Sequence, residues 1–190
     1  ALQMECGGNG RRYVHPGVSG NQWSFGAVAC PIWTGVRLAD VLRFVGLKST
    51  AVYTGHYGAD QHLTGDPTKE AISRGIPIHK ALDPHTLLAW AVNDEELPAE
   101  NGFPLRLVVP GWTGSCSQKW LTRIWVRDSV HDGAKMLGQS YRVPNHPAAP
   151  GSFVSNEEME IIHGMPVKSL ITSPQTNTVV SVGKSLQIRG

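Results

Sequence analysis

Met4-Glu5-Cys6-Gly7-Gly8-Asn9-Gly10-Arg11-Arg12 places a thiol, a glycine-rich turn and two guanidinium groups close together in the sequence. A cysteine thiolate is a natural ligand for a soft metal. The glycines let the backbone turn tightly and approach a bulky ligand, and an arginine fork suits a tetrahedral oxyanion. The alternative is a buried free cysteine beside a glycine turn. On these residues alone both interpretations stay open, and the rest of the chain must decide between them.

Composition narrows the class of protein. The chain has 190 residues, 41% hydrophobic and 17% charged residues, and a net charge of +2, which are typical of a globular protein. This charge and the absence of long basic runs argue against nucleic-acid binding. No apolar run is long enough to predict a membrane span, and no leader sequence is recognisable at Ala1. The three cysteines form no C-x-x-C pair, so a zinc ribbon is disfavoured. We expect Cys30 and Cys116 to be small core residues.

Periodicity predicts one good helix among many short strands. Leu38, Val41, Leu42 and Val45 fall on one helical face, and Gly46 stands where a left-handed cap belongs. Before this helix, Cys30 to Gly35 is typical of a turn. The segments expected to form strands are 47–77 with long turns between strands, 88–92 before an Asn93-Asp94 hairpin turn, 105–109 and 121–127. This mixture predicts an α+β fold.

The composition changes after Asp128. Residues 131–153 are rich in proline and glycine and predict an extended connection. Residues 167–172 and 185–188 have the pattern of two strands of an all-β sandwich. We expect a domain boundary near 159–166, with residues 1–158 in the first domain and 159–190 starting the second. Both ends look cut, so a fragment of a longer protein is expected.

Four blocks, in order along the chain, resemble the sulfite oxidase family of molybdopterin enzymes. They are Cys6-Gly7-Gly8-Asn9-Gly10-Arg11, Trp33-Thr34-Gly35-Val36-Arg37-Leu38-Ala39-Asp40-Val41-Leu42, Gly102-Phe103-Pro104-Leu105-Arg106-Leu107-Val108-Val109-Pro110-Gly111 and Lys119-Trp120-Leu121. The resemblance implies that residues 1–158 are the later part of an α+β molybdopterin-binding domain. It also implies that residues 159–190 begin an immunoglobulin-like β-sandwich, which mediates dimerisation in that family.

The resemblance assigns a metal ligand and three catalytic residues. Cys6 corresponds to the thiolate that binds molybdenum, and Arg11 resembles the arginine that binds the sulfite or sulfate oxyanion. Tyr141 looks like the tyrosine near the metal, and Trp23 resembles a tryptophan of the substrate pocket. The alternatives are an ordinary surface tyrosine and a core tryptophan. The sequence departs from the family at Gly10, where arginine is common, which makes Arg12 a further candidate for binding the oxyanion. It also departs at Ser19, where the family often has a lysine, which argues against a strongly positive pocket wall.

The resemblance also places residues around the pterin and its phosphate. Asn101 stands where the family has a histidine, and its amide can still form hydrogen bonds. Charge-assisted contacts from cations to a phosphate are chemically sensible, although a solvated strand edge would carry the same charges. The candidates are Asp60, Asn101, Arg106, Ser117, Gln118 and Lys119.

The implied activity is the oxidation of sulfite to sulfate by oxygen-atom transfer, with molybdenum-molybdopterin as cofactor. No C-x-x-C-H haem motif occurs in the chain, so a separate cytochrome c is the expected electron acceptor, although molecular oxygen remains open. The resemblance implies a periplasmic enzyme that forms a homodimer through its C-terminal domain. Alternatives are a sulfane dehydrogenase subunit, a nitrate reductase, a sulfoxide reductase and a non-catalytic pterin-binding module.

Overall fold

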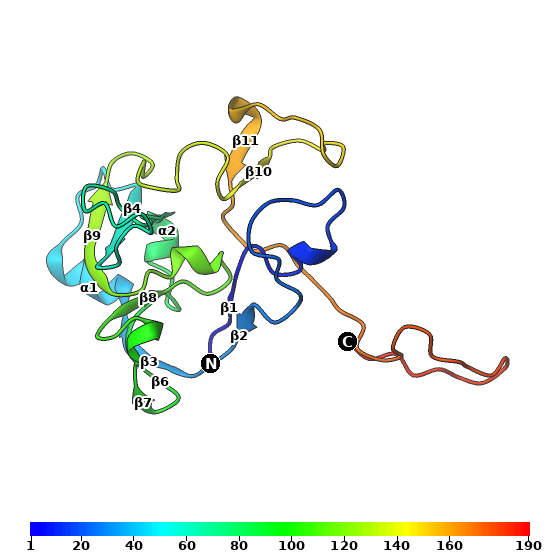
Figure 1. Ribbon diagram of the computed structural model, residues 1–190. Coiled ribbons are helices and arrows are strands. Elements are labelled where there is room, and N and C mark those ends of the chain that lie inside the picture. The colour runs from blue at the N-terminus through cyan, green and yellow to red at the C-terminus, as the bar shows by residue number, and fades with distance from the viewer.

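Two antiparallel sheets and two short helices form the body of the molecule. The computed structural model describes all residues from Ala1 to Gly190. The first sheet has the order β3-β6-β7, with β8 also paired to β6, and the second has the order β5-β4-β9. Figure 1 shows these sheets grouped with both helices on one side of the molecule. The strands of the two sheets are β3 (Trp33–Arg37), β4 (Tyr53–Gly58), β5 (Gly75–Pro77), β6 (Leu87–Val92), β7 (Glu95–Glu96), β8 (Arg106–Val108) and β9 (Leu121–Arg127).

The predicted helix is confirmed as α1 (Leu38–Val45). Leu38 and Leu42 are buried, and Gly46 follows with a φ of 82°, a backbone conformation that glycine adopts without a steric penalty. A second helix, α2 (Ile78–Ala81), follows β5 directly. The buried apolar core between the helices and the sheets consists of Leu38, Leu42, Ile76, Ala81, Leu88, Leu107, Val109, Trp112 and Cys116. The α+β prediction is therefore confirmed.

The predicted strands of the first part are present, with one correction at Gly35. The hairpin turn between β6 and β7 places Asn93 and Asp94 at positive φ, as a tight primed turn requires. The turn predicted over residues 30–35 is wrong, because β3 begins at Trp33 and runs through Gly35. At Gly35 the pairing with β6 shifts its register, and a side chain there would meet the carbonyl of Leu88. The glycine marks a bulge with close backbone contact.

Two small two-stranded sheets lie outside the main body. β1 (Met4–Glu5) pairs with β2 (Val28–Ala29) and carries the cysteine turn. β10 (Arg142–Pro144) pairs with β11 (Met159–Ile161), so part of residues 131–153, which were predicted to be an extended connection, forms a strand. The remaining elements are 3₁₀ turns at Arg11–Tyr13, Ala99–Asn101, Gly114–Cys116 and Asn156–Glu158. None of the helices is both long and apolar enough to cross a membrane.

The strands predicted over residues 167–172 and 185–188 are wrong. The segment that follows β11 leads away from the sheets (Figure 1), and its pairing is limited to isolated bridges, Gly164 with Trp112 and Ser173 with Arg189. Apolar residues such as Val167 and Val182 are fully exposed. An alternating pattern becomes a stable sheet only when partner strands cover its apolar face, and these residues have no such cover. The start of a β-sandwich expected over residues 159–190 is therefore not confirmed.

Candidate active site

A glycine turn that follows β1 holds Cys6 at the surface. The backbone N–H of Gly8 points to the Cys6 Sγ at 3.4 Å. Asn9 stabilises the loop, because its Nδ2 donates to the Glu5 carboxylate and its Oδ1 accepts the N–H of Ala27. The cysteine is exposed and forms no disulfide bond. The buried free cysteine considered from the sequence is therefore not what the fold presents at Cys6.

Cys6, Trp23 and Tyr141 meet at one open cavity of about 530 Å³, which we call the thiolate pocket. Three different segments supply these side chains, namely the cysteine turn, the loop before β2 and the residue before β10. The wall is largely apolar, and its complete lining is Met4, Glu5, Cys6, Gly7, Trp23, Gly26, Ala27, Val28, Ala29, Ile72, Gly114, Ser115 and Tyr141. The fold thus brings three of the predicted site residues together from distant parts of the sequence.

Five of the six predicted cofactor residues line an adjoining cavity of about 260 Å³, which we call the cationic pocket. Its lining is Asp60, Ile72, Arg106, Gly114, Ser115, Ser117, Gln118, Lys119 and Trp120. Ile72, Gly114 and Ser115 line both pockets, so the two cavities share a wall. An elongated ligand could therefore contact both pockets at once.

The cysteine turn packs directly on the turn that separates the two pockets. Glu5 and Thr113 form a bridge, and an added side chain on Gly114 would lie 3.0 Å from the Glu5 carbonyl oxygen. On the other side, an added side chain on Gly7 would lie 3.3 Å from a methyl group of Thr113. Small residues at both positions therefore permit the backbone contact that joins the pockets.

Arg106 is the buried centre of the cationic pocket. Its Nη1 donates to the Asn101 carbonyl at 2.7 Å and its Nη2 donates to the Ser117 carbonyl at 3.2 Å, while its Nε has no partner. Burial lowers the pKa of Arg106 to about 10, so the side chain still carries its positive charge at neutral pH. The Met4 Sδ, 3.6 Å from Nη2, and the Trp33 ring, with its centroid 5.0 Å from Cζ, are further neutral contacts. A buried cation whose partners are neutral retains most of its attraction for an anion.

Lys119 adds a second positive charge to the same cavity. Its Nζ donates to the Glu100 carbonyl at 2.8 Å. Partial burial and then the charge of Arg106 lower the pKa of Lys119, against the opposite effect of Asp60. A cation whose pKa is lowered by burial and by a neighbouring cation is stabilised when an anion binds beside it. The pocket is therefore electrostatically suited to a phosphate group.

Gln118 and Asp60 form the polar side of this cavity. The Gln118 Nε2 donates to the Asp60 Oδ1 at 3.3 Å, whereas the buried Gln118 Oε1 has no hydrogen-bond partner. A buried acceptor without a donor indicates a missing polar group. Together with the unpaired Arg106 Nε, it shows that the residues present fit a polar, anionic cofactor. Ser117 instead accepts the N–H of Val109, which fixes the backbone.

The structure does not place Arg11 or Asn101 as the sequence predicted. Arg11 lies against Gly8 and Gly20, its Nη1 donates to the Asn21 carbonyl at 3.4 Å, and it is not part of the thiolate pocket wall. Asn101 is exposed and contributes its carbonyl to Arg106, whereas its side chain does not line the cationic pocket. Asn101 thus contacts the site through its backbone, whereas the Arg11 side chain contacts the backbone of the loop before β2.

Of the two cysteines that were expected in the core, one is buried and the other is exposed. Cys116 is buried, as predicted, but Cys30 is exposed because it lies just before β3 at the edge of the fold.

One neighbour of Tyr141 was not predicted. Arg74 is buried and stacks on Tyr141, with its Cζ 4.6 Å from the ring centroid. No sequence pattern predicts this contact, because Arg74 precedes a short strand in a region without a clear periodicity.

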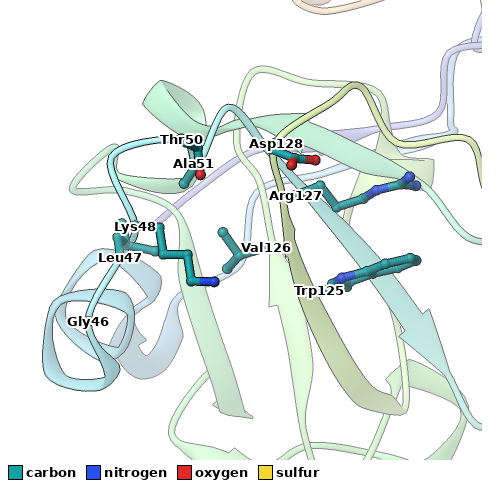
Figure 2. Close-up of a pocket in the computed structure, with 9 residues that line it drawn as sticks. All are labelled: Gly46, Leu47, Lys48, Thr50, Ala51, Trp125, Val126, Arg127 and Asp128. Carbon is teal, nitrogen blue, oxygen red and sulfur yellow. The ribbon is translucent and has the colours of Figure 1, made fainter.

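A separate groove of about 440 Å³ lies between the loop after α1 and β9 (Figure 2). Lys48, Trp125 and Arg127 are among its lining residues. Figure 2 shows Trp125 and Arg127 pointing to one side of the strand and Val126 to the other. None of the predicted site residues lines this groove, so the site lies in the two joined pockets.

Comparisons with known proteins agree with this geometry. The sequence model of the family described as "Oxidoreductase molybdopterin binding domain" matches residues 1–135. Mitochondrial sulfite oxidase of Drosophila melanogaster is 38% identical over 184 residues, which cover 93% of this chain and 31% of that protein. The NADH nitrate reductase of Ulva prolifera is 30% identical over 180 residues, which cover 90% of this chain and 21% of that protein.

A solved structure shares the fold. The crystal structure of the sulfane dehydrogenase SoxCD from Paracoccus pantotrophus superposes with a TM-score of 0.68 at 27% sequence identity. The superposition covers 91% of this chain and 40% of that one. The chain spans about a third of the length of the sulfite oxidases that it matches.

Proposed function

Because this chain belongs to the sulfite oxidase family of molybdopterin oxidoreductases, we propose that it forms part of an enzyme that oxidises sulfite to sulfate. Family membership implies a molybdenum-molybdopterin cofactor. The observation that carries the proposal is the shared wall of the two pockets, which puts an exposed thiol beside a pocket with two cations. This arrangement suits a ligand with a soft metal at one end and a phosphate at the other.

Each pocket has its own task in this proposal. Cys6 is the protein ligand of the metal, and Arg106 and Lys119 neutralise the cofactor's phosphate. Asp60 and Gln118 hydrogen-bond polar groups of the pterin, and Trp23 and Tyr141 wall the space where sulfite binds. When bound, the cofactor supplies the redox chemistry of oxygen-atom transfer. The protein's contribution is to orient the cofactor, to neutralise its charge and to exclude water.

Arg11 has a different position from the one that sulfite binding requires. Its guanidinium is held by one long hydrogen bond to the Asn21 carbonyl, so little stabilises its place over the glycines. A bound dianion attracts a nearby guanidinium strongly because charge-assisted bonds are short and bidentate. We propose that Arg11 turns toward the thiolate pocket when the substrate binds. An Arg11→Met variant then raises KM for sulfite while the molybdenum content stays the same.

The test of the function uses the full-length protein. Stoichiometric molybdenum together with sulfite-dependent reduction of cytochrome c supports the proposal. A folded, full-length protein that binds no molybdenum contradicts it and supports a non-catalytic pterin-binding module. Arg43→Met is the matched control for Arg11→Met, because Arg43 lies exposed on α1 and pairs with Asp40.

The SoxCD likeness makes a sulfane dehydrogenase subunit the second candidate, and the nitrate reductase match adds a third. Parallel assays with protein-bound sulfane sulfur, nitrate and methionine sulfoxide separate these activities from sulfite oxidation. Faster turnover of any of them than of sulfite overturns the substrate assignment and leaves the family unchanged.

Three broader features remain predictions. Residues 159–190 are expected to begin a dimerisation domain of the β-sandwich type, which analytical ultracentrifugation and a structure of the full-length protein test. A periplasmic location is tested by fractionation of the source cells. Cytochrome c as the acceptor is tested against molecular oxygen in the sulfite assay.

A further inference from the structure

Arg74 is a buried cation that no carboxylate in the structure neutralises. It lies just before β5 with only 1% of its surface exposed, and it takes part in none of the ion pairs. Its Nη1 donates to the Lys135 carbonyl at 2.7 Å, its Nη2 points to the Cys116 Sγ at 3.8 Å, and its Nε has no partner. Burying an unpaired charge is costly, so such a residue calls for an explanation beyond packing.

The face of the Tyr141 ring is the most specific contact of this cation. The Arg74 Cζ lies 4.6 Å from the ring centroid, within the range of a cation–π interaction. Tyr141 also lines the thiolate pocket together with Cys6. Its ring therefore has one contact with a buried charge and another with the cavity proposed for the substrate.

The backbone of Tyr141 needs such support. Its φ is 57°, in the left-handed region that a bulky residue seldom adopts and that costs about 1 kcal/mol or more. One backbone bond, from the Ile162 N–H to the Tyr141 carbonyl at 3.0 Å, holds the chain from the β11 side. Neither this bond nor the strand pairing contacts the ring, whereas the guanidinium stacks on its face.

We propose that Arg74 is a positioning residue, which holds the Tyr141 ring in the wall of the thiolate pocket by a buried cation–π contact. The proposal rests on the proposed function, because it assumes that Tyr141 faces the substrate. Arg74 does not touch the substrate in this proposal. Its effect on turnover passes through Tyr141, and its two anchors, Lys135 and Cys116, fix the guanidinium behind the ring.

A double-mutant cycle in the full-length, cofactor-loaded protein tests the proposal. Arg74→Met removes the charge and keeps the length, so we expect kcat/KM for sulfite to fall about tenfold or more. Arg74→Lys keeps a cation over the ring and restores activity to within about threefold. In a Tyr141→Phe background the effect of Arg74→Met shrinks to twofold or less, because the ring no longer presents its hydroxyl to the pocket. The proposal is overturned if Arg74→Met lowers kcat/KM by the same factor in the Tyr141→Phe background as in the wild type.

A second measurement does not need enzyme activity. The protein is labelled with 3-fluorotyrosine, and the fluorine resonance of Tyr141 is assigned by its loss in Tyr141→Phe. Arg74→Met is expected to shift and broaden this resonance, whereas Arg74→Lys keeps it near the wild-type position. An unchanged resonance in folded Arg74→Met overturns the positioning role even if the protein proves to have another substrate. Arg43→Met is the control for loss of an arginine, and Arg74→Lys carries both measurements if Arg74→Met does not fold.

Discussion

The two joined pockets are built in different ways. The cationic pocket rests on β8 and the segment just after it, and Arg106, Ser117 and Gln118 are all buried. The thiolate pocket is made by loops, with Cys6 exposed and Trp23 43% exposed. A binding pocket for a fixed cofactor gains from rigid, buried groups, whereas a substrate pocket needs access to solvent. This difference is consistent with the proposed function, in which the rigid cationic pocket holds the cofactor and the open thiolate pocket admits the substrate.

The largest expected effect comes from Cys6, the proposed metal ligand. Cys6→Ser should lower sulfite oxidation by more than about 100-fold, because even the outer partners of metal ligands account for 10–100-fold. If the cationic pocket holds the cofactor by itself, pterin content falls much less than activity. Activity is measured as sulfite-dependent cytochrome c reduction, and pterin by fluorescence after release. Cys30→Ser is the matched control, because Cys30 is also exposed and lies outside both pockets. Retained activity in Cys6→Ser would refute the ligand assignment.

Arg106→Met tests the rigid pocket. The substitution leaves the Asn101 and Ser117 carbonyls without their donor and removes a buried charge, so we expect a loss of about 2–3 kcal/mol in unfolding free energy. Cofactor content should fall with it. Urea denaturation of the cofactor-free protein and metal analysis of the loaded protein measure the two effects. Arg37→Met, which removes an exposed arginine at the end of β3, is the control. Normal cofactor content would show that Arg106 has only a structural role.

Acid should destabilise the sheet beside the cationic pocket. His56 on β4 is fully buried, and burial followed by the charge of His131 lowers its pKa from 6.5 to about 3. Below pH 6.5, His56 binds a proton in the unfolded chain but stays neutral in the folded chain. Stability is therefore full above pH 6.5 and falls by up to about 1.4 kcal/mol per pH unit as the pH drops toward 3.

Urea denaturation at several pH values between about 7 and 4 checks this slope, and His56→Gln should flatten it. His146→Gln is the control, because the Pro147 carbonyl and Glu158 raise the pKa of this exposed histidine. Its contribution has the opposite sign, since it is present below pH 6.5 and is lost as the pH rises. An equal slope in wild type and His56→Gln would contradict the assignment.

The smallest expected effect on stability and activity comes from Trp23, in the wall of the thiolate pocket. Trp23→Ala removes an exposed ring, so unfolding free energy should change by no more than about 0.5 kcal/mol. The KM for sulfite should rise several-fold, because the wall that excludes water is shortened. Steady-state kinetics and thermal denaturation measure both quantities, and Trp90→Ala, which removes a similarly exposed ring outside both pockets, is the control. A large loss of stability would show that the loop supports the fold as well as the substrate.

Local sequence patterns predicted most of the body of the fold. The apolar spacing of α1, the strand at β9 and the hairpin at Asn93-Asp94 depend on neighbouring residues, so the chain itself specifies them. The strand predicted over residues 167–172 does not form, because a strand is stable only when it pairs with another strand. The one strong link from that segment to the site, the Lys168 Nζ to the Glu5 carboxylate at 2.7 Å, joins residues far apart in sequence.

The sequence by itself determined the chemistry available, namely a thiol in a glycine turn and the cations Arg106 and Lys119 after recognisable turns. Only the tertiary structure decided that these groups face two cavities with a common wall, because Gly7 and Gly114 let distant backbones touch. It also decided that Arg11 lies outside the thiolate pocket and that Arg74 stacks on Tyr141. Residue types and short spacings are encoded locally, whereas pocket walls depend on contacts between segments that have no common pattern.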